Sequence, residues 1–119
     1  MRRRASILAL ATFFSLLAGC GKDPEKQSDA ELGLNAQQSH GRRLYQVYCA
    51  TCHSAYTSKG VKGPSMKGLY KKQYLPSGLL ANDRFVEQAI VQGRKMMPPF
   101  GNSLDKPDLD DLIAYLHTL

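Results

Sequence analysis

The middle of this 119-residue sequence reads Cys49-Ala50-Thr51-Cys52-His53. Two cysteines separated by two residues and followed at once by a histidine form the pattern that attaches a haem covalently to a protein chain. Each thiol can add to one of the two vinyl groups of a single porphyrin, and the adjoining imidazole then binds the iron. We therefore predict one covalently bound haem c, with thioether bonds at Cys49 and Cys52 and with His53 as the proximal iron ligand.

Two other kinds of site can be built on the same residues. A zinc site would need a fourth ligand, and only His40 and His117, both distant in the sequence, remain for that role. A redox-active cysteine pair of the thioredoxin kind would need neighbouring strands, and no segment of the chain alternates as a strand does. Both alternatives lack the sequence context that they require.

The first twenty residues have the composition of an export signal. Residues 2–4 are arginines, residues 7–17 are apolar and uncharged, and residues 17–20 read Leu-Ala-Gly-Cys. This order is typical of a signal peptide, and its end resembles the lipobox of bacterial lipoproteins. The resemblance implies a signal peptide over residues 1–19 and a diacylglycerol thioether on Cys20. An ordinary signal peptide and an N-terminal membrane helix are the alternatives, although the apolar run is shorter than the roughly 20 residues that span a bilayer.

The three cysteines are then all used, one for lipid and two for haem, so no disulfide is predicted. The net charge is +6, but three arginines lie in the predicted signal peptide, and without them 13 Lys and Arg stand against 10 Asp and Glu. The remaining charge is too small to indicate a nucleic-acid partner.

We predict that residues 20–38 form a flexible tether between the lipid and one folded domain over residues 39–119. The tether sequence is polar, mixed in charge and poor in apolar residues. A flexible segment of this length would have an average reach of about 20–25 Å. An extra helix packed on the domain is the alternative.

Three helices are predicted in the domain, and no strand. The first covers residues 39–49 and the second residues 83–92, with Gly93 at the stop position. Asp105 is expected to cap the last helix. The apolar residues of that helix follow the helical period: Leu109, Leu112, Ile113 and Leu116. Residues 54–81 are rich in Gly, Pro and Lys, and are expected to form a loop with one short helical turn at most.

Further motifs stand in a fixed order around the haem motif. Gly41 and Tyr45 precede it, and Leu112-x-x-Tyr115 lies near the C-terminal end. Two segments come between: Gly63-Pro64-Ser65-Met66-x-Gly68-Leu69 and Met97-Pro98-Pro99-Phe100-Gly101. In this order and spacing the chain resembles a class I c-type cytochrome over about residues 39–119. The resemblance implies an all-α fold, with three to five helices wrapped around one haem and the first and last helices crossing at Gly41.

The resemblance also implies roles for residues outside the haem motif. Met97, which directly precedes a proline, would be the distal iron ligand, with Met96 as its rival. The carbonyl oxygen of Pro64 would accept a hydrogen bond from Nδ1 of His53 and so orient the ring. Met66 would be a core residue against the porphyrin.

The loop beside the haem is expected to supply a hydroxyl group to a haem propionate. The sequence offers three candidates: Tyr70, Tyr74 and Ser77. We expect His40 and His117 to be solvated rather than bound to iron.

Residues 40–82 contain seven cations and no Asp or Glu. The cations are Arg42, Arg43, Lys59, Lys62, Lys67, Lys71 and Lys72. A positively charged rim around the haem would steer docking onto an acidic partner and would raise the association rate more than the affinity. The alternative is a solvated loop that is merely rich in lysine.

Together these features predict a one-electron carrier rather than an enzyme. We expect a monomer that meets redox protein donors and acceptors transiently and is held by lipid, facing the periplasm, on an inner or outer bacterial membrane. One alternative is a haem enzyme or gas sensor with a labile sixth ligand. Another is a haem relay subunit of a larger respiratory complex.

Overall fold

The computed structural model describes residues 21–119, so the predicted signal peptide and the lipid site at Cys20 lie outside the described residues. The elements are two 3₁₀ turns and three α-helices: η1 (Pro24–Lys26), α1 (Ala36–Tyr48), η2 (Leu69–Lys71), α2 (Asp83–Gln92) and α3 (Lys106–Leu116). Within residues 21–119 there is no strand, only two isolated bridges. The fold is therefore all-α, as predicted.

Helix α1 begins earlier than the predicted start at Ser39. The side chain of Asn35 accepts a hydrogen bond from the Gln38 backbone N–H (2.8 Å), and the Gln38 side chain accepts one from the Asn35 backbone N–H (3.0 Å). This reciprocal cap satisfies two backbone donors at the start of the helix. The boundary predicted between residues 38 and 39 therefore falls inside α1, and the helical part of the domain starts at Ala36.

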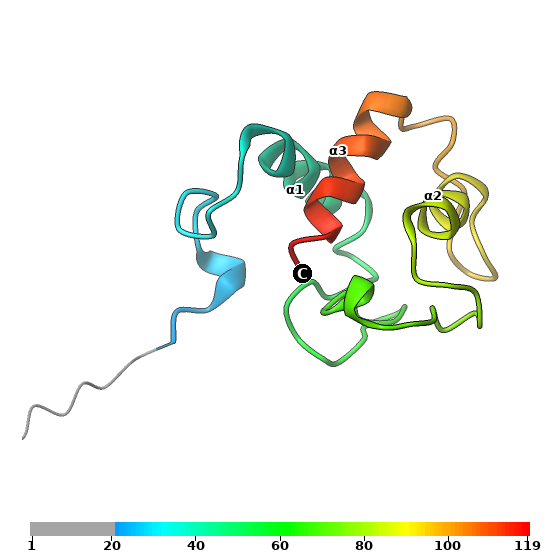
Figure 1. The fold of residues 1–119 in the computed structure, drawn as a ribbon, viewed down its shortest axis with the longest axis horizontal. Helices are drawn as coiled ribbons and strands as arrows, with labels where there is room; N and C mark the ends of the chain where they lie inside the picture. The colour runs from blue at the N-terminus through cyan, green and yellow to red at the C-terminus, as the bar shows by residue number, and fades with distance from the viewer. Residues whose placement is uncertain (1–20) are drawn as a thin grey trace, which may run out of the picture.

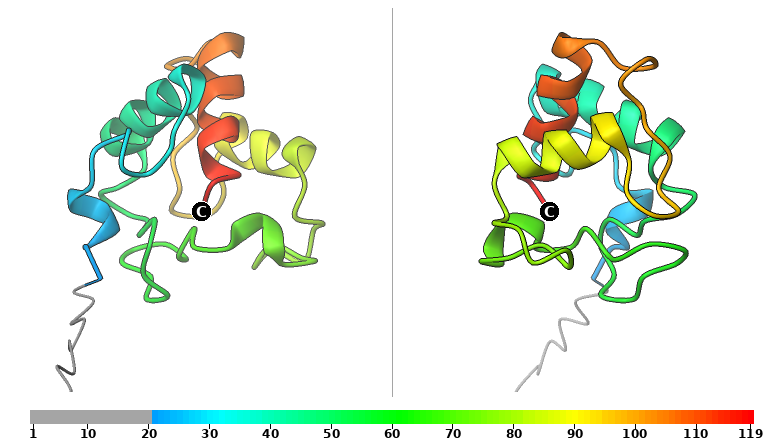
Figure 2. Two further views of the ribbon diagram at one scale, coloured as in Figure 1. Left: turned by 60° about the vertical axis from the view of Figure 1, so that its left-hand side comes forward. Right: turned by 90° about the vertical axis from the view of Figure 1, so that its right-hand side faces the viewer.

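Helices α1 and α3 cross closely (Figures 1 and 2), and Gly41 lies at their closest approach. A Cβ atom at Gly41 would lie 1.9 Å from the backbone oxygen of Asp111 and 2.9 Å from the Cβ of Tyr115, so the contact requires glycine. Beside it, the rings of Tyr45 and Tyr115 meet edge to face, with centroids 5.5 Å apart. The predicted crossing is confirmed, and it forms the centre of the core.

Helix α3 carries the densest part of the apolar core. Asp105 caps it by accepting a hydrogen bond from the Asp108 backbone N–H (2.9 Å), as predicted. Leu104 and Leu109, on either side of the cap, are both buried and can pack together as a hydrophobic staple. Leu112 is fully buried, in the helix that packs against α1.

Helix α2 has the predicted bounds, and the side chain of Asn82 caps it by accepting from the Phe85 backbone N–H (3.1 Å). Gly93 ends the helix with φ at +70°. A Cβ atom there would lie 2.5 Å from the Met97 backbone oxygen and 2.9 Å from the carbonyl carbon of Pro98. Gly93 therefore also lets the Met-Pro-Pro segment fold back against the end of α2.

Residues 21–35, predicted as part of a flexible tether, make defined contacts with the domain. Leu34 packs against the core, and Asp29 forms an ion pair with Arg42 of α1 (2.7 Å). None of the helices within residues 21–119 has the length and apolar character needed to cross a membrane.

Candidate functional site

The cysteine motif begins where α1 ends. Cys49 is the C-cap residue of α1, and its carbonyl oxygen accepts hydrogen bonds from the backbone N–H groups of Cys52 (3.0 Å) and His53 (2.9 Å). These bonds form a tight turn directly after the end of α1. The turn brings the two thiols and the imidazole together. Both cysteines are half-buried, and neither is in a disulfide.

The protonation of Cys49 argues against a thiol redox site. Burial, together with the neighbouring Cys52, raises the pKa of the Cys49 thiol to about 12. Reactive cysteine pairs have the opposite property, a lowered pKa that provides thiolate at neutral pH. The zinc alternative is also unsupported, because no three His, Cys, Asp or Glu side chains within residues 21–119 gather into a metal site.

His53 is oriented by the Pro64 carbonyl. The distance from Nδ1 of His53 to the Pro64 oxygen is 2.7 Å. A carbonyl can only accept, so Nδ1 carries the proton, and in the neutral ring this places the lone pair on the other ring nitrogen, Nε2. No hydrogen bond from the described part of the chain reaches Nε2. The ring is therefore in the tautomer that a metal ion requires.

Backbone hydrogen bonds hold the Pro64 loop against the cysteine motif. The Gly63 N–H donates to the Cys52 oxygen (2.8 Å), and the Met66 N–H donates to the Ser54 oxygen (2.8 Å). A Cβ atom at Gly63 would lie 2.4 Å from Cε1 of His53, so glycine is needed for the imidazole to approach this loop so closely. The proximal side of the site is thus defined by contacts within residues 49–66.

Tyr45 adds a contact that the sequence did not indicate. Its hydroxyl group donates to the His53 backbone oxygen (2.7 Å) from a ring that is almost fully buried. Burial raises the pKa of this phenol far above its ordinary value, so the group stays a donor. In the sequence, Tyr45 stands out only as part of the motif that precedes the cysteines, because a hydroxyl to carbonyl contact leaves no periodic signal.

The Met97 segment lies at the far end of α2. Arg94 and Met97 exchange two backbone hydrogen bonds (3.0 and 2.8 Å), which close a tight turn. The Phe100 N–H then donates to the Ile90 oxygen (2.9 Å) and fixes the segment on α2. Met97 is half-buried against the core, whereas Met96 is 86% exposed. This difference favours Met97 over Met96 as an inward-facing ligand.

Half-buried apolar side chains connect the cysteine motif with the Met97 segment. The rings of Tyr48 and Phe100 meet edge to face, with centroids 5.7 Å apart. The others that pack on the core from these segments and the loop are Met66, Leu75, Val91 and Met97. Such incompletely buried apolar groups, together with two thiols, one imidazole lone pair and one thioether, are the donors and the lining that a covalently bound haem requires. The residues present therefore fit the group.

His40 and His117 were expected to be solvated rather than bound to iron, and their side chains are 40% and 46% exposed. Each also contacts a carboxylate of another helix: His40 contacts Asp111 (2.8 Å) and His117 contacts Asp83 (2.8 Å). Neither histidine is one of the residues brought to the Cys49–Met97 site.

Tyr70, Tyr74 and Ser77 were the candidates for a hydroxyl contact to the haem. Tyr70 stacks on His117 with ring centroids 3.7 Å apart, and its hydroxyl is buried without a hydrogen-bond partner in the described structure. Tyr74 is 52% exposed, and Ser77 is also exposed. Of the three candidates, only Tyr70 thus carries a buried hydroxyl group, and that group lies beside Asp83.

One of the seven cations predicted for the positively charged rim is not at the surface. Arg42 is buried and paired, whereas the other six cations of residues 40–82 are exposed. Two more exposed cations, Arg94 and Lys95, lie next to Met97. The exposed positive charge therefore flanks both the cysteine motif and the Met97 segment.

Comparison with known proteins places this site in a family. The model of the family described as "Cytochrome C oxidase, cbb3-type, subunit III" matches residues 36–116. The "Cytochrome bc1 complex cytochrome c subunit" of Corynebacterium diphtheriae is 32% identical over 82 residues, which cover 68% of this chain and 27% of that protein. "Cytochrome c2 iso-1" of Magnetospirillum molischianum is 28% identical over 89 residues, covering 60% of this chain and 89% of that protein.

The chain thus spans about a quarter of the length of the Corynebacterium subunit and most of the length of the cytochrome c2. The family match covers all three α-helices and every motif from Gly41 to Tyr115. With its cysteine motif, its oriented histidine and its crossed helices, the chain belongs to the cbb3-type subunit III family and is a class I c-type cytochrome.

Proposed function

We propose that the protein is a one-electron carrier with one haem c, attached at Cys49 and Cys52 and ligated by His53 and Met97. When bound, haem supplies an iron that cycles between Fe(II) and Fe(III). The observation that carries the proposal is the hydrogen bond from Nδ1 of His53 to Pro64, which leaves Nε2 to face the iron.

The chain's own residues would set how the site behaves. Pro64 and Tyr45 hold the His53 ring and backbone in place before and after electron transfer. Pro98 and Pro99 have fixed φ angles and therefore stiffen the segment that carries Met97. A thioether is a soft, neutral ligand that favours the ferrous state, so Met97 would raise the reduction potential.

A redox titration of the haem-loaded protein tests this proposal. We expect one haem per chain by mass spectrometry and a single reversible one-electron transition. Cys49→Ser and Cys52→Ser should each reduce covalent haem attachment. A transition of more than one electron, or a haem that denaturing solvent extracts from the unmutated protein, would contradict it.

We propose that the partners are acidic redox proteins that dock transiently. The exposed cations beside the cysteine motif and Met97 support this, since an acidic partner would be attracted to both segments. The rate of electron transfer to such a partner should fall as ionic strength rises. A rate that does not depend on salt would exclude electrostatic steering and leave the lysine-rich loop as a solvated surface.

We also propose that the protein is exported and held at a membrane by lipid on Cys20, as a monomer. The sequence of residues 1–20 supports the export signal and the lipid site. Mass spectrometry of the N-terminal peptide tests it, because lipidation adds the mass of the diacyl group and Cys20→Ser should abolish that addition.

A haem relay subunit within a larger complex is the second candidate. It is favoured by the name of the Corynebacterium relative, which is a subunit of a complex and is far longer than this chain. Isolation in mild detergent distinguishes the two, because a relay subunit would co-purify in fixed proportion with other chains and a free carrier would not.

A further inference from the structure

The segment that leads from the lipid site to α1 is folded and not extended. We call residues 22–35 the N-terminal arm. Within it, backbone N–H groups of Leu32 and Leu34 donate to the oxygens of Ser28 (3.1 Å) and Asp29 (2.9 Å). Gly33, with φ at +69°, allows the chain to reverse before α1 starts. The arm therefore forms a compact turn against the start of the domain.

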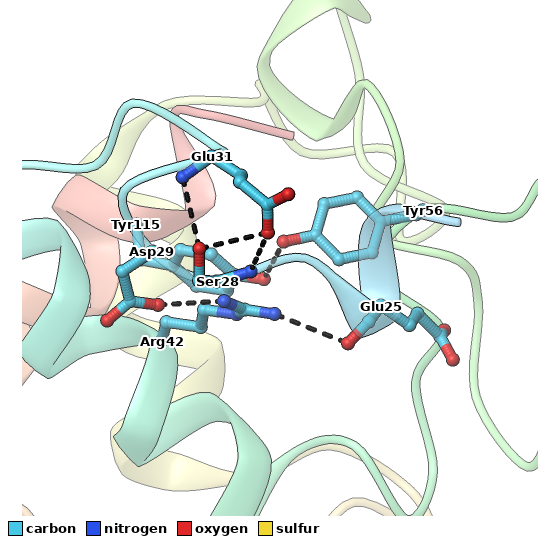
Figure 3. Close-up of polar contacts among 7 residues, drawn as sticks. All are labelled: Glu25, Ser28, Asp29, Glu31, Arg42, Tyr56 and Tyr115. Carbon is cyan, nitrogen blue, oxygen red and sulfur yellow. Dashed lines mark hydrogen bonds and ion pairs between the residues drawn. The ribbon is translucent and has the colours of Figure 1, made fainter. Parts of the chain in front are cut away.

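Arg42 of α1 fixes this arm to the domain (Figure 3). Its guanidinium donates to Oδ1 of Asp29 (2.7 Å) and to the Glu25 backbone oxygen (3.4 Å). The Arg42 side chain is only 8% exposed, although it is charged. A buried guanidinium is costly unless a carboxylate and further acceptors satisfy it. The arm supplies both, so folding of the domain and docking of the arm are coupled.

The contact lies next to the helix crossing. Tyr56 and Tyr115, whose hydroxyl oxygens are 2.8 Å apart, stand beside the Arg42 guanidinium (Figure 3). Tyr115 is fully buried in α3. The arm is thereby connected through Arg42 to both α1 and α3, the two helices that organise the core.

A second group of polar contacts braces the arm itself. The backbone N–H and the hydroxyl of Ser28 both donate to Oε2 of Glu31 (3.0 Å each), and Lys22 pairs with the other oxygen of Glu31 (2.7 Å). The contacts therefore begin only two residues after Cys20.

The length of free chain follows from these contacts. Glu25 lies five positions after Cys20, and this stretch of chain spans about 18 Å at most when fully extended. If the arm were free up to Asn35, fifteen residues could extend to about 50 Å. Docking of the arm thus shortens the possible distance between the lipid and the domain to about a third.

We propose that the N-terminal arm is a docked leash, that is, a short linker fixed to α1 by the ion pair between Asp29 and Arg42. The docked arm holds the domain close to the bilayer. It also places the α1 face of the domain at the point of attachment. This inference rests on the proposed lipid at Cys20. It implies that the redox partner presents its own electron-transfer surface near the membrane surface, within reach of a short and oriented leash.

Hydrogen exchange in the haem-loaded full chain tests the docking without depending on lipid. Arg42→Met removes the buried charge and both arm contacts, and it keeps an apolar side chain in place. We expect the Leu34 amide to exchange at least about tenfold faster in this variant, while the Leu116 amide in α3 keeps its protection. Asp29→Asn should act in the same direction. Asp110→Asn is the matched control, because it removes the same charge from an exposed position of α3.

Leu34 exchange that is equally fast in the unmutated protein and in Arg42→Met would overturn the docking. Loss of protection at Leu116 in Arg42→Met would mean that the variant has lost its core, and Asp29→Asn would then decide the question. If Asp29→Asn also leaves Leu34 unchanged, the arm is not held by the ion pair.

Vesicles of phosphatidylethanolamine and phosphatidylglycerol, with a fluorescent headgroup label, test how close the arm holds the domain to the bilayer. The bound haem should quench the label strongly in the lipidated protein and more weakly in Arg42→Met, because the released arm lets the domain move away. Equal quenching would overturn the leash. If the protein does not bind vesicles at all, the proposed lipid anchor fails, whereas the exchange experiment still reports separately on the arm.

Discussion

The two sides of the haem site are built in different ways. The His53 side is held by contacts among residues 49–66, including Nδ1 of His53 to Pro64 and the Gly63 N–H to Cys52. The Met97 side is held by a turn that lies on the end of α2, where Gly93 leaves room for it. The first side depends on hydrogen bonds to a specific ring, and the second depends on backbone packing. Mutations should therefore disturb ligand orientation on the first side and segment position on the second.

The largest effect is expected on the Met97 side from Gly93→Ala. The new Cβ would meet backbone atoms 2.5–2.9 Å away, and the φ of +70° is unfavourable for alanine. We expect the free energy of unfolding of the haem-loaded protein to fall by about 2–4 kcal/mol, measured by urea denaturation.

Gly78→Ala is the control for Gly93→Ala. Gly78 has a similar φ of +83°, but a Cβ there would meet no atom within 4 Å. It should cost only the backbone strain, about 1–2 kcal/mol. Equal losses in the two variants would show that the Met97 segment does not press on Gly93.

On the His53 side, Gly63→Ala is expected to have the next largest effect. The added Cβ would lie 2.4 Å from Cε1 of His53, and the imidazole would have to tilt. We expect a loss of about 1–3 kcal/mol in stability together with a changed visible spectrum of the bound haem. Gly21→Ala, where a Cβ meets nothing within 4 Å, should change neither. An unaltered spectrum in Gly63→Ala would mean that this loop does not set the ring orientation.

Tyr45→Phe should weaken the His53 side more gently. It removes the hydroxyl that donates to the His53 backbone oxygen and leaves the ring in place. The expected cost is about 0.5–1.5 kcal/mol of unfolding free energy. Tyr74→Phe, at a half-exposed site, serves as the control and should have almost no effect.

The smallest effect concerns pH and the helix crossing that supports both sides. The hydrogen bond from His40 lowers the pKa of Asp111 below its ordinary value of 3.8. The pKa of Asp111 is thus lower in the folded protein than in the unfolded chain. The hydrogen bond therefore stabilises the fold above the unfolded pKa of Asp111, and this stabilisation is lost as pH falls through the folded pKa. Asp108, 3.9 Å from the same ring, also faces His40.

Asp111→Asn should therefore reduce the dependence of stability on pH below about pH 4, by less than about 1 kcal/mol since the pair is partly exposed. Urea denaturation at several pH values measures this, with Asp110→Asn as the control for loss of an exposed charge. If the unfolding free energy of Asp111→Asn falls with acid as steeply as that of the unmutated protein, the His40 contact does not stabilise the crossing.

The sequence, through its resemblance to a known family, predicted the contact between Pro64 and His53, but it did not indicate the contact of the Tyr45 hydroxyl with the His53 backbone. The same resemblance predicted the crossing at Gly41, whereas the bounds of α2 and the cap at Asp105 follow from short-range signals. The cap formed by Asn35 and Gln38 was missed, and α1 was therefore predicted to start too late.

The contacts that the sequence could not predict join distant residues. Arg42 and Asp29 are thirteen residues apart across an irregular segment, so no periodic pattern pairs them. His40 and His117 likewise find carboxylates 71 and 34 residues away. The sequence already favoured Met97 over Met96 because Met97 directly precedes a proline, and the different exposure of the two side chains points the same way.

Binding of carbon monoxide to the reduced, haem-loaded protein tests most directly whether Met97 completes the iron coordination. The visible spectrum should not change on addition of carbon monoxide to the unmutated protein or to Met96→Ala, whereas Met97→Ala should bind it readily. Ready binding by the unmutated protein would contradict the electron-carrier account and favour a haem enzyme or gas sensor with an open sixth position.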